Sequence, residues 1–260
     1  MNIQQYYRVT AITSLNGSLA SLFPIIFLIL PTYLLMSKKE MLLFAIPFLL
    51  YSFLSYQFYL INQARFTQSA SCSSENPSLS LPQGNHTLLT FLPAPSLRVL
   101  FFNPDGRACG EIRDLRFKRV RWFLPYFIDK RLPAEYGFFD EDHELLATFK
   151  WETRSALVKD KQNNLVLSID VKGSRLFRLT TMDGITFIKI KSESLISDIQ
   201  FITEGNGVVG RVRKGWMPLE WGKYFVDANT PVLTLDGHLS KEEKLGILAL
   251  FIKQYRYYNH

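Results

Sequence analysis

The sequence predicts a membrane-anchored α+β protein, in which a transmembrane helical hairpin precedes a β-barrel of roughly 12 antiparallel strands closed around a hydrophobic C-terminal helix. Three observations predict this class. Uncharged apolar segments lie near the N-terminus, short alternating strands separated by turn residues begin at about residue 96, and an apolar run lies near the C-terminus. We expect a hairpin at 1–64, a linker at 65–95 and the barrel at 96–260, with its central helix at about 241–257.

Two segments without charge predict the hairpin. Residues 9–37 and 41–64 contain no Asp, Glu, Lys or Arg. Within them, residues 19–36 and 41–61 are each long and apolar enough for a membrane span. The connector at 37–40 is short, so the spans should run antiparallel. Because neither span carries a charged side chain, they indicate an anchor rather than an ion or proton pathway.

A cleaved signal peptide is the alternative interpretation of the first span. Only Arg8 precedes it, its apolar stretch is overlong, and the second span follows directly, all of which favour the hairpin. Pro24, Pro31 and Pro47 predict bends. Basic residues flank the hairpin equally at both ends, so their number does not set its orientation.

The next stretch, residues 66–95, has the composition of a linker. It is rich in Ser and Pro and nearly free of charge, so it buries too little apolar surface to fold alone. Within it, Asn85-His-Thr87 matches a glycosylation acceptor, which matters only if the region faces a secretory lumen. Residues 86–92 could form a short edge strand.

From residue 96 the chain repeats one unit: a short alternating strand, a turn containing Asp, Asn or Gly, and another strand. This unit is typical of β-hairpins. A barrel of about twelve strands has an interior wider than its own side chains fill, since about eight strands already give a filled core. The strands are expected at 97–102, 108–113, 136–139, 145–149, 155–158, 165–169, 175–179, 185–190, 196–202, 208–212, 224–226 and 232–235.

The C-terminal segment predicts a helix that must be surrounded by other parts of the protein. Ser240 followed by Glu243 is a capping box, which marks a helix start. From Leu245 to Ile252 no face carries a polar residue, so the helix must be buried on all sides. This run covers roughly 12 Å, far less than the ~30 Å hydrocarbon core, so protein rather than lipid should surround it.

The stretches Gly210–Trp216 and Lys223–Ala228, together with the apolar terminal helix, resemble the tubby C-terminal superfamily, whose branches include the phospholipid scramblases and the LURP-one-related proteins. Three Asp-Gly turns fit the same group: Asp105-Gly106, Asp183-Gly184 and Asp236-Gly237. The resemblance covers roughly residues 96–260. It implies a twelve-stranded barrel around a central C-terminal helix, in a domain on the cytoplasmic side of the cell membrane.

The scramblase branch also implies a calcium segment directly before the helix, corresponding to Asp227–Glu243. Asp227, Asn229 and Asp236 match it loosely. The acidic run that leads into the scramblase helix is replaced here by His238-Leu-Ser-Lys241. We therefore expect neither a metal nor another cofactor.

Two basic clusters are the candidate sites. The denser one lies at 113–123, where apolar and basic residues alternate, and the second precedes Trp216. Each charge contributes ~1 kcal/mol beside anionic lipid headgroups; the alternative is the solvated face of an ordinary amphipathic strand. The candidate lipid-binding residues are Arg116, Lys118, Arg119, Arg121, Trp122, Arg211, Arg213 and Lys214.

Motifs for catalysis are missing from the sequence. The four histidines have no metal-ligand spacing, and there is no Gly-rich phosphate loop, nucleophile elbow or Walker motif. Two cysteines are too few for a disulfide framework. Of the net charge of +7, the barrel carries +5 over 165 residues, which is too diffuse to favour nucleic acid.

We therefore expect a non-enzymatic, multi-pass protein of the cell membrane that binds or senses phospholipid. The alternative is a protein-interaction scaffold or an accessory, immunity-type factor for another membrane protein.

Overall fold

The computed structural model describes residues 1–32, 38–70, 86–94, 96–116, 135–182, 184–193 and 198–256. The chain divides into two compact units. The helical unit is Asn2–Ser71, and the barrel unit comprises Cys72–His260 together with Met1.

The helical unit contains α1 (Ile3–Ala20), α2 (Phe23–Thr32) and α3 (Lys38–Gln68). Helical structure begins well before residue 19, where the first span was expected to start. The interruption between α1 and α2, at residues 21–22, comes shortly before Pro24, whose missing N–H cannot continue the hydrogen bonding of α1 but is tolerated in the first turn of α2. By contrast, α3 continues through Pro47.

The helices α1 and α3 bury both apolar and small polar side chains, such as Ala11 and Ser18, and expose large apolar ones. Ser18 is buried, its hydroxyl oxygen lies 3.0 Å from that of Ser52, and the Ser52 hydroxyl donates to the Ser18 carbonyl at 3.1 Å. Nearer the base of the hairpin, the Gln4 amide donates to the Ser69 carbonyl at 2.8 Å. Large apolar side chains cover the exposed side of α3; they include Leu42, Leu43, Phe44, Leu50, Phe53 and Leu54.

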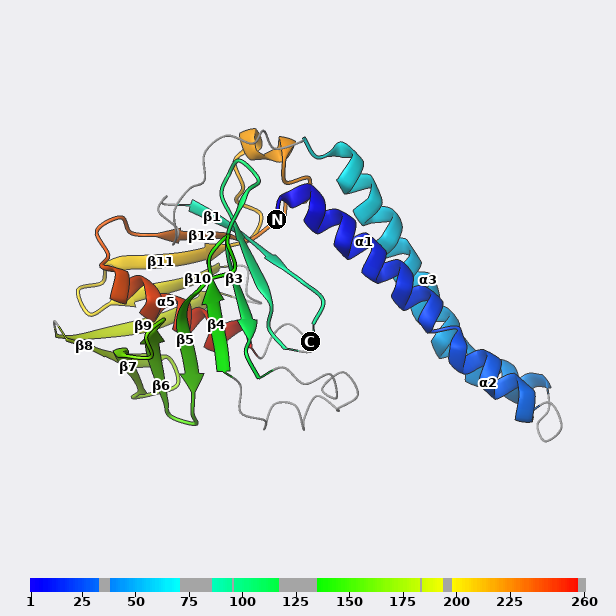
Figure 1. Ribbon diagram of the computed structural model, residues 1–260, viewed down its shortest axis with the longest axis horizontal. Helices are drawn as coiled ribbons and strands as arrows, with labels where there is room; N and C mark the ends of the chain where they lie inside the picture. The colour runs from blue at the N-terminus through cyan, green and yellow to red at the C-terminus, as the bar shows by residue number, and fades with distance from the viewer. Residues whose placement is uncertain are drawn as a thin grey trace. The chain divides into compact units, whose positions relative to one another are not determined.

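The barrel unit contains a closed antiparallel barrel of twelve strands, as the sequence predicts (Figure 1). Strands consecutive in sequence are neighbours, and β1 pairs with β12 to close the ring. The strands are β1 (His86–Phe91), β2 (Val99–Phe102), β3 (Ala108–Asp114), β4 (Glu135–Phe139), β5 (Leu145–Trp151), β6 (Ser155–Asp160), β7 (Leu165–Val171), β8 (Leu176–Thr181), β9 (Ile185–Glu193), β10 (Asp198–Thr203), β11 (Val208–Arg213) and β12 (Val232–Leu235).

One expected strand is wrong, and another takes its place. Residues 224–226 follow the 3₁₀-helix η2 (Leu219–Lys223), and the backbone N–H groups of Tyr224 and Phe225 both donate to the Trp221 carbonyl. Those donors are therefore not available to a strand ladder. The twelfth strand is β1, which lies inside the stretch expected to be a linker. It pairs on both sides, with β2 and β12, so it is not the edge strand that residues 86–92 were expected to form.

The C-terminal helix α5 (Lys241–Tyr255) begins with the predicted capping box between Ser240 and Glu243. Every residue from Leu245 to Ile252 is buried. The Trp151 indole of β5 donates to the Ala249 carbonyl at 3.2 Å, and the Phe251 ring meets Phe101 of β2 edge-on. A Cβ at Gly246 would lie 2.5 Å from Leu179 Cδ2 of β8, so the helix approaches this strand too closely for a side chain there.

Candidate lipid-facing surface

The two ends of the barrel differ in net charge, although each also holds residues of the opposite sign, such as Lys161 at one end and Glu152 at the other. Because consecutive strands are antiparallel neighbours, every second connection lies at the same end. One end, here called the acidic end, holds the turns before β3, β5, β7, β9 and β11 and the start of α5. Its described carboxylates are Asp105, Asp140, Glu141, Asp142, Glu144, Asp160, Glu204, Asp236, Glu242 and Glu243.

The opposite end, here called the basic end, holds the connections after β1, β3, β5, β7, β9 and β11 and the last turn of α5. Its described basic residues are Arg98, Arg113, Arg116, Lys150, Arg154, Lys172, Arg175, Arg211, Arg213, Lys214, Lys223, Lys253 and Arg256. Sequence reasoning found local basic clusters but missed this polarity. The signal that could have found it is the alternation of acidic and basic connections along the predicted meander.

Several of these basic side chains pair with carboxylates on neighbouring strands. Arg116 bonds to Glu135 at 2.7 Å, between the ends of β3 and β4. Arg211 forms a two-pronged pair with Asp198 across β10 and β11, with the Arg211 Nε to Asp198 Oδ1 distance at 2.8 Å. The Arg211 hydrogen bond holds the pKa of the Asp198 carboxyl below its usual value. Both arginines are candidate lipid-binding residues, and their pairing lowers the net charge that they present to a membrane.

The connection after β11 presents charge and apolar surface together; residues Arg213–Tyr224 are here called the basic-aromatic loop. The Arg213 guanidinium lies 4.5 Å from the centroid of the Trp216 ring. That tryptophan is 66% exposed, and Leu219, on η2, is 96% exposed. Gly215 has a φ of 71°, a conformation that glycine adopts without strain, and it turns the chain between Lys214 and Trp216.

Within the described part of the chain, the loop's cations do not bond directly to carboxylates, although the charge of Arg213 helps to lower the pKa of the Asp198 carboxyl. Among the described residues, Arg213, Lys214 and Lys223 form no ion pair, and Lys223 lies 4.9 Å from the centroid of the Tyr224 ring. The structure therefore brings Arg213 and Lys214 together with an exposed tryptophan, as the sequence suggests. It adds Leu219 and Lys223, which the sequence analysis did not single out. The candidates Lys118, Arg119, Arg121 and Trp122 lie outside the described residues and stay predictions.

A further cation at the basic end is enclosed by rings. Lys253 Nζ, in the last turn of α5, lies 4.6 Å from the Trp151 ring centroid and 4.8 Å from that of Phe177. Burial lowers the pKa of the Lys253 ammonium. This charge is stabilised by aromatic faces within the protein, so it is less available to a ligand than the cations of the basic-aromatic loop.

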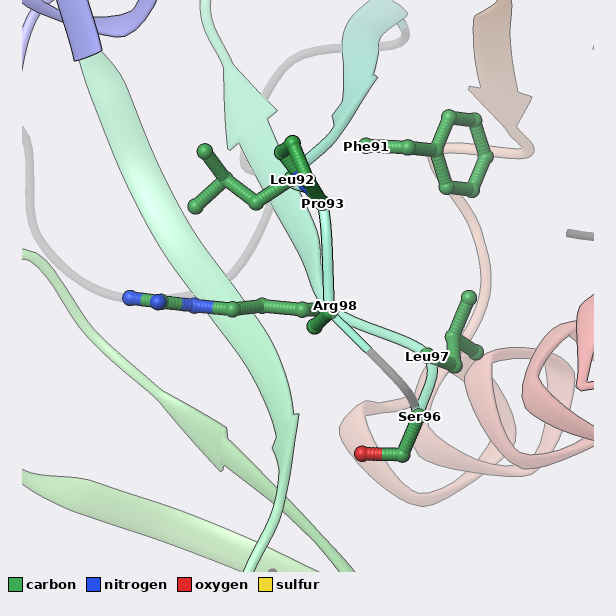
Figure 2. Close-up of a pocket in the computed structure, with 7 residues that line it drawn as sticks. Phe91, Leu92, Pro93, Ser96, Leu97 and Arg98 are labelled. Atoms are coloured by element: carbon green, nitrogen blue, oxygen red, sulfur yellow. The ribbon is translucent and has the colours of Figure 1, made fainter. Parts of the chain in front are cut away.

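The β1–β2 connection lines an open pocket of about 320 Å³, formed by residues 91–94 and 96–98 (Figure 2). Figure 2 shows Leu92 and Arg98 pointing to one side of this connection and Phe91 and Leu97 to the other. The Arg98 guanidinium bonds to the buried Glu111 at 2.7 Å. That pair neutralises the arginine, so the described lining is mainly apolar, with the Ser96 hydroxyl as its polar group.

Histidines and carboxylates do not gather into a metal site within the described ranges. No protein-family model, curated protein or solved structure matches this chain. The resemblance to the tubby C-terminal superfamily therefore stays a prediction from the residues that carry it.

Proposed function

We propose that this chain is a non-enzymatic, membrane-anchored protein whose barrel binds the surface of an anionic phospholipid bilayer. The observation that carries the proposal is the basic-aromatic loop. There, Arg213, Lys214 and Lys223 lie beside Trp216 and Leu219, two of the most exposed apolar side chains of the barrel unit. Cations suit anionic headgroups, and a tryptophan favours the boundary between headgroups and acyl chains.

The anchor is supported by the many apolar side chains that the helical unit exposes. Ile3–Phe27 and Met41–Gln68 are long and apolar enough to cross a membrane. Serines meet in the interior while leucines and phenylalanines cover the exterior. Such a distribution would expose a large apolar surface to water, whereas small polar interhelical contacts are typical of helices packed in lipid. Multi-pass insertion in the cell membrane follows, with the barrel assigned to the cytoplasm by the family resemblance.

The tubby-like interpretation is supported by the contacts of α5. We infer that the helix occupies the interior of the barrel, because it approaches β2 at Phe251, β8 at Gly246 and β11 at Ile247. These strands lie far apart around the ring. A barrel of about twelve strands has the room that such a helix requires.

The electrostatic contribution to the free energy of membrane binding follows from the charges of the loop. The loop holds three cations and Glu220, a net charge of +2; at ~1 kcal/mol per charge this gives about 2 kcal/mol beside an anionic surface, which corresponds to roughly thirtyfold in affinity. This attraction weakens with salt, because screening shortens the range of exposed charges. The apolar contribution of Trp216 and Leu219 should persist at high salt.

Vesicle binding by the barrel unit tests the proposal. The fragment should begin at Cys72, because a fragment beginning at residue 96 would lack β1 and leave the ring open. Arg213→Glu/Lys214→Glu should weaken sedimentation with phosphatidylserine vesicles by about 30-fold or more. The matched control, Lys161→Glu/Lys241→Glu, makes the same charge change at the acidic end and should bind like the unmodified fragment. Equal binding to neutral and anionic vesicles would refute the proposal.

A protein-interaction scaffold is the second candidate, and exposed apolar residues at the acidic end favour it. Met182 is 92% exposed, and Leu165, Ile185 and Val208, which begin β7, β9 and β11, are also exposed. Stoichiometric co-purification with a membrane protein, lost in Met182→Asp but unaffected by Arg213→Glu/Lys214→Glu, would support the scaffold over lipid binding.

A further inference from the structure

The outer side of α1 carries a polar side chain that the hairpin itself does not use. Asn16 is exposed, and its carboxamide takes part in no hydrogen bond among the described residues. At 100° per residue, Asn16 lies about 200° around the helix from Ser18, the residue that contacts α3. The carboxamide therefore points away from the interior of the hairpin, among exposed apolar side chains such as Val9, Ile12 and Leu19.

The contact between Ser18 and Ser52 gives the depth of this amide. Because α1 and α3 are antiparallel, Asn16 lies at about the level of Leu54. Along α3 that level is about 16 Å from Arg65 at one end of the uncharged stretch and about 22 Å from Lys39 at the other. If the hairpin spans the bilayer as proposed above, Asn16 lies close to the middle of the hydrocarbon core.

An unpaired carboxamide at that depth is unfavourable, because lipid tails offer no hydrogen-bond partner. We propose that Asn16 joins two copies of this chain into a dimer within the membrane. A carboxamide both donates and accepts. Two copies related by a twofold axis can therefore form reciprocal Asn16–Asn16 hydrogen bonds, so that the same surface satisfies itself. The small Ala20, one turn along the same side of α1, leaves room for a second helix to approach.

Two nearby polar groups, those of Thr13 and Gln57, do not compete for this role. The Thr13 hydroxyl donates to the Val9 carbonyl of its own helix at 2.9 Å, so it is already satisfied. Gln57 on α3 is also exposed, but it lies only about 12 Å from Arg65 along the helix. Its longer side chain can reach the headgroup region from there. Asn16 is the deeper of the two amides and the one that needs a protein partner.

Disulfide trapping in the full chain tests the dimer. In a Cys72→Ser background, Ala20→Cys places a thiol on the Asn16 side of α1, and Ser14→Cys places one on the side that faces α3. Cys109 is buried, with its pKa raised to about 12 by burial, so it should not cross-link. Membranes holding each variant are oxidised with copper phenanthroline, and the covalent dimer is quantified. Carbonate extraction of the same membranes measures anchoring separately.

We expect Ala20→Cys to form the dimer efficiently and Ser14→Cys to form little. Adding Asn16→Leu should lower the dimer yield, with the association constant falling roughly three- to thirtyfold. Adding Thr13→Val, the matched control, should leave the yield unchanged. An equal yield with Asn16→Leu, or equal cross-linking from Ser14→Cys, would overturn the dimer while carbonate resistance still supported the anchor. Release by carbonate would overturn the anchor, and the dimer with it.

Discussion

Replacing Gly246 with valine tests the close packing of α5 against the strands. A Cβ at this position would lie 2.5 Å from Leu179 Cδ2 and 3.7 Å from Leu167 Cδ2. Both leucines are about 1% exposed, so neither side chain can rotate into solvent to make room. Valine adds two further methyl groups beyond the Cβ, and at least one of the leucines must shift within the core.

Two opposing contributions determine how much Gly246→Val changes the free energy of unfolding. Overpacking a well-packed core costs about 1–3 kcal/mol. Replacing glycine with valine inside a helix returns about 0.3–0.5 kcal/mol of helix propensity. The free energy of unfolding should therefore fall by about 0.5–2.5 kcal/mol. For a helix lying free of the strands, only the propensity term would remain and the protein would become slightly more stable, so the sign of the change is decisive.

The assay is guanidinium denaturation of the full chain in detergent, followed by tryptophan fluorescence. All four tryptophans follow residue 120, so the signal reports the barrel unit and not the hairpin. Gly205→Val is the matched control, because a Cβ there would meet nothing within 4 Å; it should change stability by less than about 0.5 kcal/mol.

A double-mutant cycle tests whether Leu179 is the side chain that a valine at position 246 displaces. Leu179→Ala alone should cost about 2–5 kcal/mol, and the space it opens should accept the valine. Gly246→Val combined with Leu179→Ala should therefore be less destabilised than the sum of the two single changes, by about 1 kcal/mol or more. A stable Gly246→Val variant, or strict additivity in the cycle, would refute the packing described here.

Two further predictions concern the strands. Because Arg211 holds the pKa of Asp198 low, the pair stabilises the fold above the ordinary carboxyl pKa of about 4 and is lost as pH falls through the lowered value. Asp198→Asn should thus cost about 1 kcal/mol at pH 7 in denaturant titrations and progressively less below pH 4, and a cost independent of pH would contradict the pairing. Burial raises the pKa of Cys109 to about 12. In a Cys72→Ser background, alkylation at pH 8 should therefore be roughly 1000-fold slower in the native state than in denaturant, and similar rates would mean that this strand is accessible.

The strands that could be predicted are those whose pattern is local. In β5, Ala147, Phe149 and Trp151 are buried while Lys150 is exposed, and this alternation is visible in the sequence without knowledge of the neighbours. The prediction of a strand at residues 224–226 was wrong because the apolar side chain there is buried without belonging to a strand. Phe225 is fully buried, but it packs against Phe102 from the end of a 3₁₀ turn rather than from a strand.

The candidate site was predictable only in part, for a related reason. Arg213, Lys214 and Trp216 are close in sequence, so their proximity in the basic-aromatic loop was foreseeable. The pairing of Arg211 with Asp198 depends on the register of β10 against β11, which a single alternating pattern does not specify. The sequence therefore identified where the basic residues are, but not which of them keep a free charge.

By itself, the sequence determined the features that arise within a few residues of chain: the capping box at Ser240, the apolar run of α5, the uncharged lengths of the hairpin and the alternation of most strands. Only the tertiary structure decided that β1 closes the ring against β12, across a separation such as His86 to Thr234, and that acidic and basic connections collect at opposite ends. The physical reason is the separation along the chain over which each interaction acts. Caps and hydrophobic periodicity act between near neighbours, whereas ring closure and charge pairing depend on which distant strands meet, and that is settled by the packing of the whole barrel.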